Sequence, residues 1–433
     1  MQWDCDGERQ QLSYRELAAR ADAIAGYLDA VAGSDDGTVA VVGSWQPDMV
    51  AAMIGILRSG RSYLPVDIDY PPSRVEHILN DAGRPPVLLQ HGMPAPDGFG
   101  NRCHPVREAM ASGRTPATPA AHGDIAYVVY TSGSSGKPKG VQVGHGAAVY
   151  STAERSRVYA QWPPETFLLL SSFAFDSAVA GLWWTLSTGG CLRLVDRSTA
   201  RAADAVAALI HRERITHTLC LPGQWSDICR ISAQPLDSMQ LVIVAGEACT
   251  GKTIRAHYRC VPGAALYNEY GPTEMAVWST CHPLPADTRE PVAIGSPLGL
   301  TQALVVDAHG NPVPRGLAGE LVLAGPGIAA GYVGAAQGGF IAHPLDDSAR
   351  AYRTGDRARI GSDGLVYYLG RSDEQVKYRG YRIGIEAIEQ SLSAGGPEVA
   401  VIPWDGRSLE DLVAELPEDQ AHALLDKYLA ATA

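Results

Sequence analysis

Residues Tyr130 to Gly140 read Tyr-Thr-Ser-Gly-Ser-Ser-Gly-Lys-Pro-Lys-Gly and follow the apolar run Ile125 to Val129. The glycines allow the backbone to turn so that successive N–H groups point at one anion. Hydroxyls and ammonium groups add further donors, from Thr131, Ser132, Ser134, Ser135, Lys137 and Lys139. An apolar strand followed by such a loop predicts a phosphate-binding site rather than a flexible surface loop. Pro138 stands where a Walker A loop needs Ser or Thr for magnesium, which excludes that motif here.

Outward from this loop, apolar strands and amphipathic helices alternate along the chain. Before the loop, the pattern predicts a helix over 14–30 capped by Ser13, a strand at 38–42, and helices over 49–57 and from Ser73. After the loop, it predicts strands at 167–171, 191–195, 217–221 and 240–244, separated by helices at 178–186, 202–212 and 253–259. Such alternation predicts an α/β fold with two mostly parallel-sheet subdomains.

After about residue 291 the sequence changes to short β-rich pieces punctuated by glycine, at 303–307, 320–324, 357–360 and 365–368. This change predicts a small β-barrel subdomain after the two α/β subdomains.

Composition and charge limit the classes of function. With 433 residues, 46% apolar and 19% charged, the chain is typical of a soluble globular protein. A net charge of −12 argues against a nucleic-acid partner. The chain has no long uncharged apolar run and no signal region at Met1, so we expect no membrane segment and a cytoplasmic location. The eight cysteines lack Cys-x-x-Cys pairs and zinc spacing, so we expect neither disulfides nor zinc.

Three further segments carry chemical groups. Asn268 to Glu274 presents an aromatic ring, a hydroxyl and a carboxylate around a Gly-Pro turn, although such a turn by itself is ordinary. Tyr352 to Asp356 places a carboxylate, which we expect to be exposed at a tight glycine turn, where it can accept two ribose hydroxyls. Gly370 to Ile383 is rich in charge.

In this order, the segments resemble those of the adenylate-forming superfamily. Supporting matches lie at Leu12 to Leu17, Leu57 to Asp67, Gly319 to Leu321 and Gly331-Tyr332, so the resemblance covers residues 12 to 389. It implies an N-terminal core, residues 1–372, that binds ATP and substrate, and a C-terminal lid from 373–433 that rotates about the hinge Asp373.

The resemblance also implies roles for single residues, with ATP and Mg²⁺ as cofactors. Tyr270 lies against adenine, Thr273 meets the α-phosphate, Glu274 binds the metal, and Asp356 binds the ribose. Nucleotide binding is implied for Thr131, Ser132, Gly133, Ser134, Ser135, Gly136, Lys137, Tyr270, Thr273, Asp356 and Arg371, and catalysis for Thr131, Lys139, Thr273 and Glu274.

Phe175-Asp176-Ser177 resembles the motif of amino-acid-activating domains of nonribosomal peptide synthetases, in which the carboxylate pairs with the substrate α-ammonium. Asp176 can also cap a helix, and the two roles are compatible. The implied pocket comprises Asp176, Ser177, Ala180, Cys220, Ile243, Ala245, Gly246, Glu269, Val277 and Trp278. Small alanines and apolar walls favour an aromatic amino acid of tyrosine type. A basic amino acid is the runner-up, because Glu269 can pair with a cationic or hydroxylated tip or else face solvent.

The resemblance implies a two-step reaction. The amino-acid carboxylate attacks the α-phosphorus to give aminoacyl-AMP and pyrophosphate, and the aminoacyl group then passes to the phosphopantetheine thiol of a carrier protein. A small MbtH-like activating protein is a further implied partner. The chain ends at Ala433 without the Gly-Lys segment of a full lid, Ala330 replaces an Arg of the family, and Arg382 to Glu386 departs from its usual order. We therefore expect slowed adenylation and impaired thiol transfer.

Three alternatives remain open. Gly246 to Thr253 fits the Walker A pattern after a predicted strand, which would make the chain a P-loop NTPase, although Glu247 would place a carboxylate in the phosphate loop. An acyl- or aryl-acid CoA-ligase-like enzyme would share the nucleotide motifs but would not need Asp176. A nucleotide- and amino-acid-binding fragment without catalysis is the third.

Overall fold

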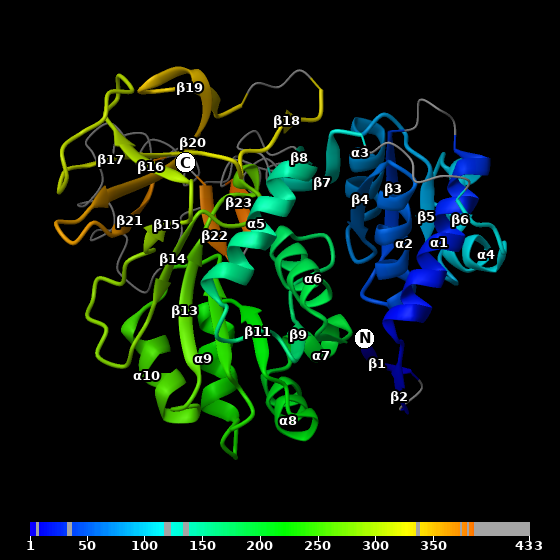
Figure 1. The fold of residues 1–433 in the computed structure, drawn as a ribbon, viewed down its shortest axis with the longest axis horizontal. Helices are drawn as coiled ribbons and strands as arrows, with labels where there is room; N and C mark the ends of the chain where they lie inside the picture. The colour runs from blue at the N-terminus through cyan, green and yellow to red at the C-terminus, as the bar shows by residue number, and fades with distance from the viewer. Residues whose placement is uncertain are drawn as a thin grey trace, which may run out of the picture.

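The computed structural model describes residues 1–5, 8–32, 37–116, 123–132, 138–334, 338–372, 375–378 and 381–384. Figure 1 shows two α/β units side by side and a β-rich unit at the upper end of the one on the left. In the described part of the chain, no helix combines the length and the apolar composition that a membrane crossing needs.

Among the described residues, seven strands form the sheet of the first unit, in the order β18-β8-β7-β4-β3-β5-β6. The strands are β3 Thr38–Gly43, β4 Ser62–Asp67, β5 Val87–Leu89, β6 Cys103–Pro105, β7 Ile125–Ser132, β8 Pro138–Gly144 and β18 Gly331–Tyr332. The accompanying helices are α1 Tyr14–Val31, α2 Pro47–Arg58, α3 Pro72–Asp81 and α4 Val106–Ala111, with a 3-10 turn at Gly100–Arg102. Ser13 and Glu16 form a capping box at the start of α1, as its sequence predicts.

Nine strands, again counted over the described residues, form the sheet of the second unit, in the order β15-β14-β13-β12-β11-β9-β10-β1-β2. They are β1 Gln2–Cys5, β2 Glu8–Gln11, β9 Thr166–Leu169, β10 Cys191–Leu194, β11 His217–Cys220, β12 Leu241–Ala245, β13 Ala265–Tyr270, β14 Thr280–Pro283 and β15 Ser296–Pro297. The helices are α5 His145–Val158, α6 Asp176–Thr188, α7 Arg197–Arg201, α8 Ala203–Glu213, α9 Pro222–Ile231 and α10 Gly251–Cys260. Strands β1 and β9 to β13 run parallel, as the alternation predicts.

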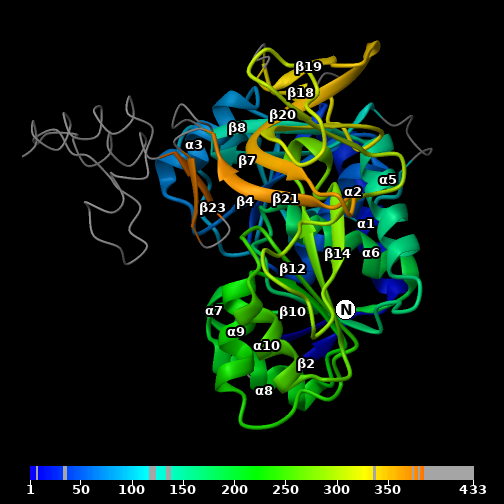
Figure 2. The same cartoon turned by 90° about the vertical axis from the view of Figure 1, so that its left-hand side faces the viewer.

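The two sheets share one buried layer of helices. Alternate residues of each strand point to opposite faces, so Ile243 packs toward α6 whereas Val242 and Val244 pack toward α8 to α10. Figure 2 shows α9 and α10 on one side of the nine-stranded sheet and α5 and α6 on the other. The core cluster that contains α6 also contains Val41 of β3 and Tyr127 of β7, so it is continuous between the two sheets.

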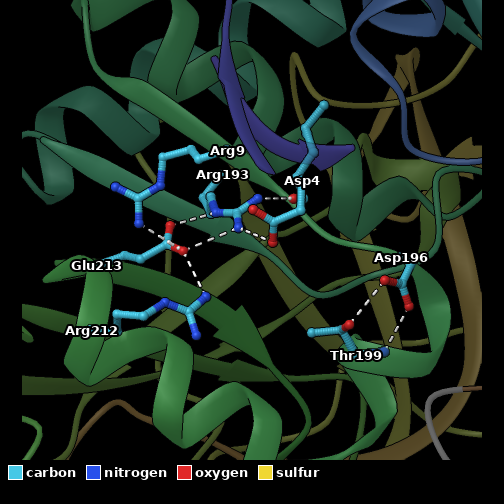
Figure 3. Close-up of polar contacts among 8 residues, drawn as sticks. Asp4, Arg9, Arg193, Asp196, Thr199, Arg212 and Glu213 are labelled. Atoms are coloured by element: carbon cyan, nitrogen blue, oxygen red, sulfur yellow. Dashed lines mark hydrogen bonds and ion pairs between the residues drawn. The ribbon is translucent and has the colours of Figure 1, made fainter. Parts of the chain in front are cut away.

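A hairpin formed by β1 and β2 extends the nine-stranded sheet at one edge, and ion pairs fasten it there (Figure 3). Arg193 of β10 is fully buried and pairs with Glu213 of α8 at 2.6 Å and with Asp4 of β1 at 2.5 Å. Arg9 of β2 also reaches Glu213, at 2.9 Å. A buried guanidinium with two carboxylate partners satisfies the requirement that a buried charge be paired. The sequence pattern did not predict this hairpin.

The β-rich unit is built around the long strand β20 Asp346–Ile360. The strand order is β16-β17-β20-β19, and β21 also pairs with β20. These strands are β16 Gln302–Val306, β17 Ala318–Ala324, β19 Phe340–His343 and β21 Val366–Arg371. The β-subdomain is therefore confirmed, but the pairings among described residues form an open series, so closure into a barrel stays a prediction. Strands β22 Gln375–Tyr378 and β23 Tyr381–Gly384 form a separate hairpin. The rest of the predicted lid and its hinge Asp373 lie outside the described residues.

Candidate active site

The predicted phosphate loop connects two antiparallel strands, β7 and β8, whose register pairs Thr131 with Lys139. Residues Gly133 to Lys137 and the side chain of Ser132 lie outside what the structure describes. Strand β18 pairs with the other side of β8, and the backbone N–H of Val333 donates to the carbonyl of Gly140 at 2.8 Å. Strand β8, which follows the loop, is thus held between β7 and β18.

The carboxylate of Glu274 lies in a 3-10 turn, Thr273–Met275, directly after β13. It is buried, and its Oε1 accepts a hydrogen bond from the Tyr332 hydroxyl at 2.7 Å. Its Oε2 is buried and has no hydrogen-bond partner among the residues that the structure describes. Because an unpartnered buried carboxylate oxygen is costly and is a hard oxygen ligand, this donor fits a magnesium ion. Lys139 Nζ lies 5.9 Å from the centre of the Tyr332 ring, so the base of the phosphate loop and Glu274 face the same tyrosine.

Asp176 is the first residue of α6 and contacts the same turn. Its Oδ2 accepts a hydrogen bond from the Thr273 hydroxyl at 2.5 Å. The predicted ammonium-binding and α-phosphate-binding side chains are therefore in direct contact, although 97 residues separate them in the chain. Burial raises the pKa of Asp176 to about 6, and the Thr273 hydrogen bond offsets part of that rise.

This raised pKa gives a testable pH dependence. An Asp whose folded-state pKa exceeds its unfolded value binds protons more strongly when folded, so stability falls as pH rises between roughly 4 and 6, by about 3 kcal/mol at most. Asp176→Asn removes this loss, because the amide oxygen can still accept from Thr273. We expect Asp176→Asn to be the more stable protein at pH 8 and close to wild type at pH 4, measured by urea unfolding without ligands. If the variant were less stable than wild type at pH 8, burial of the ionised Asp176 carboxylate would not be destabilising.

Asp356 lies within β20 rather than at an exposed turn, so that expectation is wrong. The carboxylate is buried and accepts from the Tyr270 hydroxyl at 2.5 Å and from Arg371 Nη1 at 2.7 Å. The structure thus brings together three predicted nucleotide-binding residues from β13, β20 and β21.

Most predicted pocket residues lie between α6 and the nine-stranded sheet. Ser177 donates to Ser171 Oγ at 2.9 Å, and Ala180 and Ile243 belong to the same core cluster. Ala245 ends β12 and is the register partner of Glu269 on β13, and Gly246 follows with a φ of 85°. Cys220 does not join this wall, because its side chain packs on the opposite face of the sheet, toward α8 to α10.

The turn that carries the last two pocket residues is strained. Ala276 and Val277 have φ values of 52° and 85°, a region that β-branched residues rarely adopt. Helix α5 holds this turn, because Ser151 Oγ donates to the Ala276 carbonyl at 2.7 Å and Trp278 Nε1 donates to the Ser151 carbonyl at 3.2 Å. Backbone strain of this kind persists only where the surroundings fix it, and it is concentrated at functional sites.

Glu269 does not face solvent, contrary to one of the two expectations for it. Its side chain is 2% exposed, and both carboxylate oxygens pair with Arg155 of α5, at 2.6 and 2.8 Å. The Tyr159 hydroxyl donates a third hydrogen bond to Oε1, at 2.6 Å. A cationic substrate tip would therefore have to compete with an internal guanidinium.

Comparison with known proteins agrees with this arrangement. The family model described as AMP-binding enzyme matches residues 2–333. The chain belongs to this family. Among curated proteins, it is 34% identical over 392 residues to bacitracin synthase 3 of Bacillus licheniformis, covering 89% of this chain and 6% of that protein. It is also 34% identical over 396 residues to tyrocidine synthase 3 of Brevibacillus parabrevis, covering 89% of this chain and 6% of that protein.

Solved structures give the same assignment. The nonribosomal peptide synthetase FmoA3 superposes with a TM-score of 0.77 at 29% identity, over 85% of this chain and 40% of that one. The N-terminal subdomain of Klebsiella oxytoca NpsA superposes with a TM-score of 0.74 at 25% identity, over 85% and 95%. The chain is thus an adenylation domain of the nonribosomal peptide synthetase type, and it spans a small part of the synthases it matches.

The alternative P-loop in this adenylation domain is contradicted by its geometry. The Gly251 N–H at the start of α10, which a P-loop would offer to phosphate, instead donates to the Glu290 carboxylate at 2.7 Å. The Thr253 hydroxyl, which would bind magnesium, is buried and accepts from Ser226 at 3.0 Å. A fixed carboxylate at the helix N-terminus repels phosphate, so the pattern at 246–253 is fortuitous.

Two residues of the site were not singled out by the sequence analysis. Tyr332 appeared there only within a supporting motif, yet its hydroxyl joins Glu274 to the strand that pairs with β8. Arg155 lies in α5, a helix that the sequence analysis did not predict. The only available signal was an arginine among small residues on the inward face of that helix, with Ala147 and Ser151.

Proposed function

We propose that the chain activates an amino acid with ATP, forming aminoacyl-AMP and releasing pyrophosphate, for transfer to the phosphopantetheine thiol of a carrier protein. The contact between Asp176 and Thr273 carries this proposal, because it joins the predicted ammonium site to the predicted α-phosphate site. An amino acid whose ammonium pairs with Asp176 holds its carboxylate within a few bonds of that anchor. FmoA3, a structural neighbour, has been solved with alpha-methyl-L-serine-AMP bound.

In this reaction a carboxylate oxygen of the substrate forms a bond to the α-phosphorus, and the bond from that phosphorus to the pyrophosphate oxygen breaks. No protein nucleophile is required. Asp176 orients the substrate, Thr273 and Lys139 stabilise charge on the α-phosphate, and Asp356 and Tyr270 hold the nucleoside. Orientation and fixed charge supply the rate enhancement in such a scheme.

Magnesium would be held by Glu274, with Oε2 as the available ligand oxygen. When bound there, it would neutralise phosphate charge during the reaction.

The substrate we favour is an uncharged amino acid, with the aromatic, tyrosine-type side chain as first choice. The basic runner-up is disfavoured because Glu269 is already neutralised by Arg155. A carrier protein, a small MbtH-like activating protein and a cytoplasmic setting belong to the same proposal. The synthase relatives support the carrier protein, and the free thiols of the described cysteines agree with a cytoplasmic setting.

An aryl-acid-activating enzyme is the second candidate, since the NpsA subdomain that superposes on this chain carries 3-hydroxybenzoyl-AMSN. The deciding experiment is substrate-dependent ATP–pyrophosphate exchange across aromatic, aliphatic and basic amino acids and matched carboxylic acids. Exchange with one amino-acid class supports the proposal. Exchange with a carboxylic acid lacking the amine, unaffected by Asp176→Asn, would establish the second candidate instead.

Substitution of two lysines distinguishes the phosphate loop at 130–140 from the alternative P-loop at 246–253. Lys139→Ala removes a cation beside the phosphate-loop hairpin, and we expect exchange to fall by about 10- to 100-fold, since hydrogen bonds to charged groups are worth about 1.5–3 kcal/mol. Lys252→Ala removes a cation at the start of α10, and we expect wild-type exchange. The reverse pattern would return the P-loop to consideration.

A further inference from the structure

A buried ion pair lies among the predicted pocket residues. Arg155 and Glu269 side chains are each 2% exposed and make two parallel N–H···O contacts. The guanidinium carbon lies 4.3 Å from the centre of the Trp278 ring and 6.0 Å from that of Trp184. Tyr159, which stacks on Trp278 with ring centres 5.9 Å apart, donates to the same carboxylate.

Helix α6 gives the position of this pair relative to the ammonium site. Asp176, Ala180 and Trp184 lie four residues apart and so share one face of the helix. At 1.5 Å per residue, Ala180 is ~6 Å and Trp184 ~12 Å from Asp176 along the axis. Helical side chains lean toward the helix N-terminus. The Trp184 ring and the guanidinium beside it therefore lie between the axial positions of Ala180 and Trp184. Lysine and ornithine carry a cation on the order of 6 Å from Cα, which brings it to the same depth.

We propose that Arg155 is a specificity-determining residue: its guanidinium fills a cation-accepting subsite formed by Glu269, Tyr159 and Trp278 at the end of the amino-acid pocket. This inference rests on the proposed function. The subsite has the features that recognise a basic side chain, namely a buried carboxylate and an aromatic face. The protein supplies the cation itself, so basic amino acids are excluded and uncharged side chains are accepted.

The charge of Arg155 explains why basic amino acids are excluded. A substrate ammonium entering beside Arg155 would meet a like charge and find both Glu269 oxygens already engaged. A second buried cation without a partner is strongly disfavoured. Removing the guanidinium while leaving Glu269 in place leaves the carboxylate unpaired, and a basic substrate can then satisfy it.

The test measures binding, because binding does not require turnover. Purified wild-type chain, Arg155→Met, the double variant Arg155→Met/Glu269→Gln and the control Arg157→Met are titrated with sulfamoyl-adenosine conjugates of lysine, ornithine, leucine and tyrosine. Thermal shift and calorimetry provide the readouts. Arg157 is on the same helix but is 62% exposed.

We expect wild type and Arg157→Met to bind an uncharged conjugate and to reject the basic ones. Arg155→Met should gain at least 10-fold in affinity for the lysyl or ornithyl conjugate, and the double variant should lose that gain. Tight binding of a basic conjugate by wild type would overturn the inference, even if Arg155→Met fails to fold. A folded Arg155→Met with no gain would overturn it too. Binding of no aminoacyl conjugate at all would refute the proposed function itself, and the inference with it.

Discussion

Asp176→Asn is expected to lower amino-acid-dependent ATP–pyrophosphate exchange by about 10²- to 10⁴-fold. Removing one partner of a buried charge pair costs about 3–5 kcal/mol, and each 1.4 kcal/mol is a factor of ten. The loss should arise when the substrate ammonium enters the buried site, because the Asn amide carries no charge to pair with it.

The variant also separates loss of recognition from loss of folding. Asn keeps the shape of Asp and an acceptor for the Thr273 hydroxyl, so the unfolding midpoint should not fall at neutral pH. ATP should bind with unchanged affinity. Exchange that survives in a folded Asp176→Asn protein would exclude an ammonium-binding role for this residue.

Glu274→Gln is expected to lower the exchange rate by about 10²- to 10³-fold, the range found when one preorganised electrostatic contact to a reacting group is removed. Oε2 has no partner within the described part of the chain, whereas Oε1 accepts from Tyr332. Gln can keep the Tyr332 contact and loses only the charge. The effect should therefore appear in the magnesium dependence of exchange rather than in the stability of the fold.

A graded companion variant tests the same geometry. Tyr332→Phe removes the hydroxyl that orients Glu274 and leaves the ring beside Lys139. Its exchange rate should lie between those of wild type and Glu274→Gln, with a higher magnesium requirement. If Tyr332→Phe matched wild type at limiting magnesium, the tyrosine would have no role in positioning the carboxylate.

Local patterns in the sequence predicted much of the fold because the elements concerned bury apolar side chains with a clear period. Strand β3 and helices α1, α6 and α8 were found within a residue or two of their ends. Helix α5 was missed because its inward face carries Ala147, Ser151 and Arg155. This face therefore lacks the stripe of apolar side chains from which a buried helix is predicted. The hairpin of β1 and β2 was missed because its strands are short and polar, and because its main partner, Arg193, is distant in sequence.

In the candidate site, only residues that belong to a sequence motif could be predicted. Asp176, Thr273 and Glu274 each belong to a motif, and the structure brings them together. The partner of Glu269 could not be inferred, since 114 residues separate it from Arg155 and no periodicity relates two positions on different elements. Asp356 was expected at an exposed turn because a glycine precedes it, but β20 continues through that glycine.

The continuous core between the two sheets bears on how such domains can be recombined. Asp176, Glu269 and Trp278 come from the unit that contains the nine-stranded sheet, whereas the hairpin of β7 and β8 belongs to the other unit. A chimera that exchanged only the substrate-recognising half with a relative would be joined through the buried helices α1, α2, α5 and α6, where packing tolerates few mismatches. A graft bounded by α6 and the turn at 273–278 also carries part of this core, including Trp184, Ile243 and Trp278, so the residues of α1 and α2 in the same cluster would have to be matched to it.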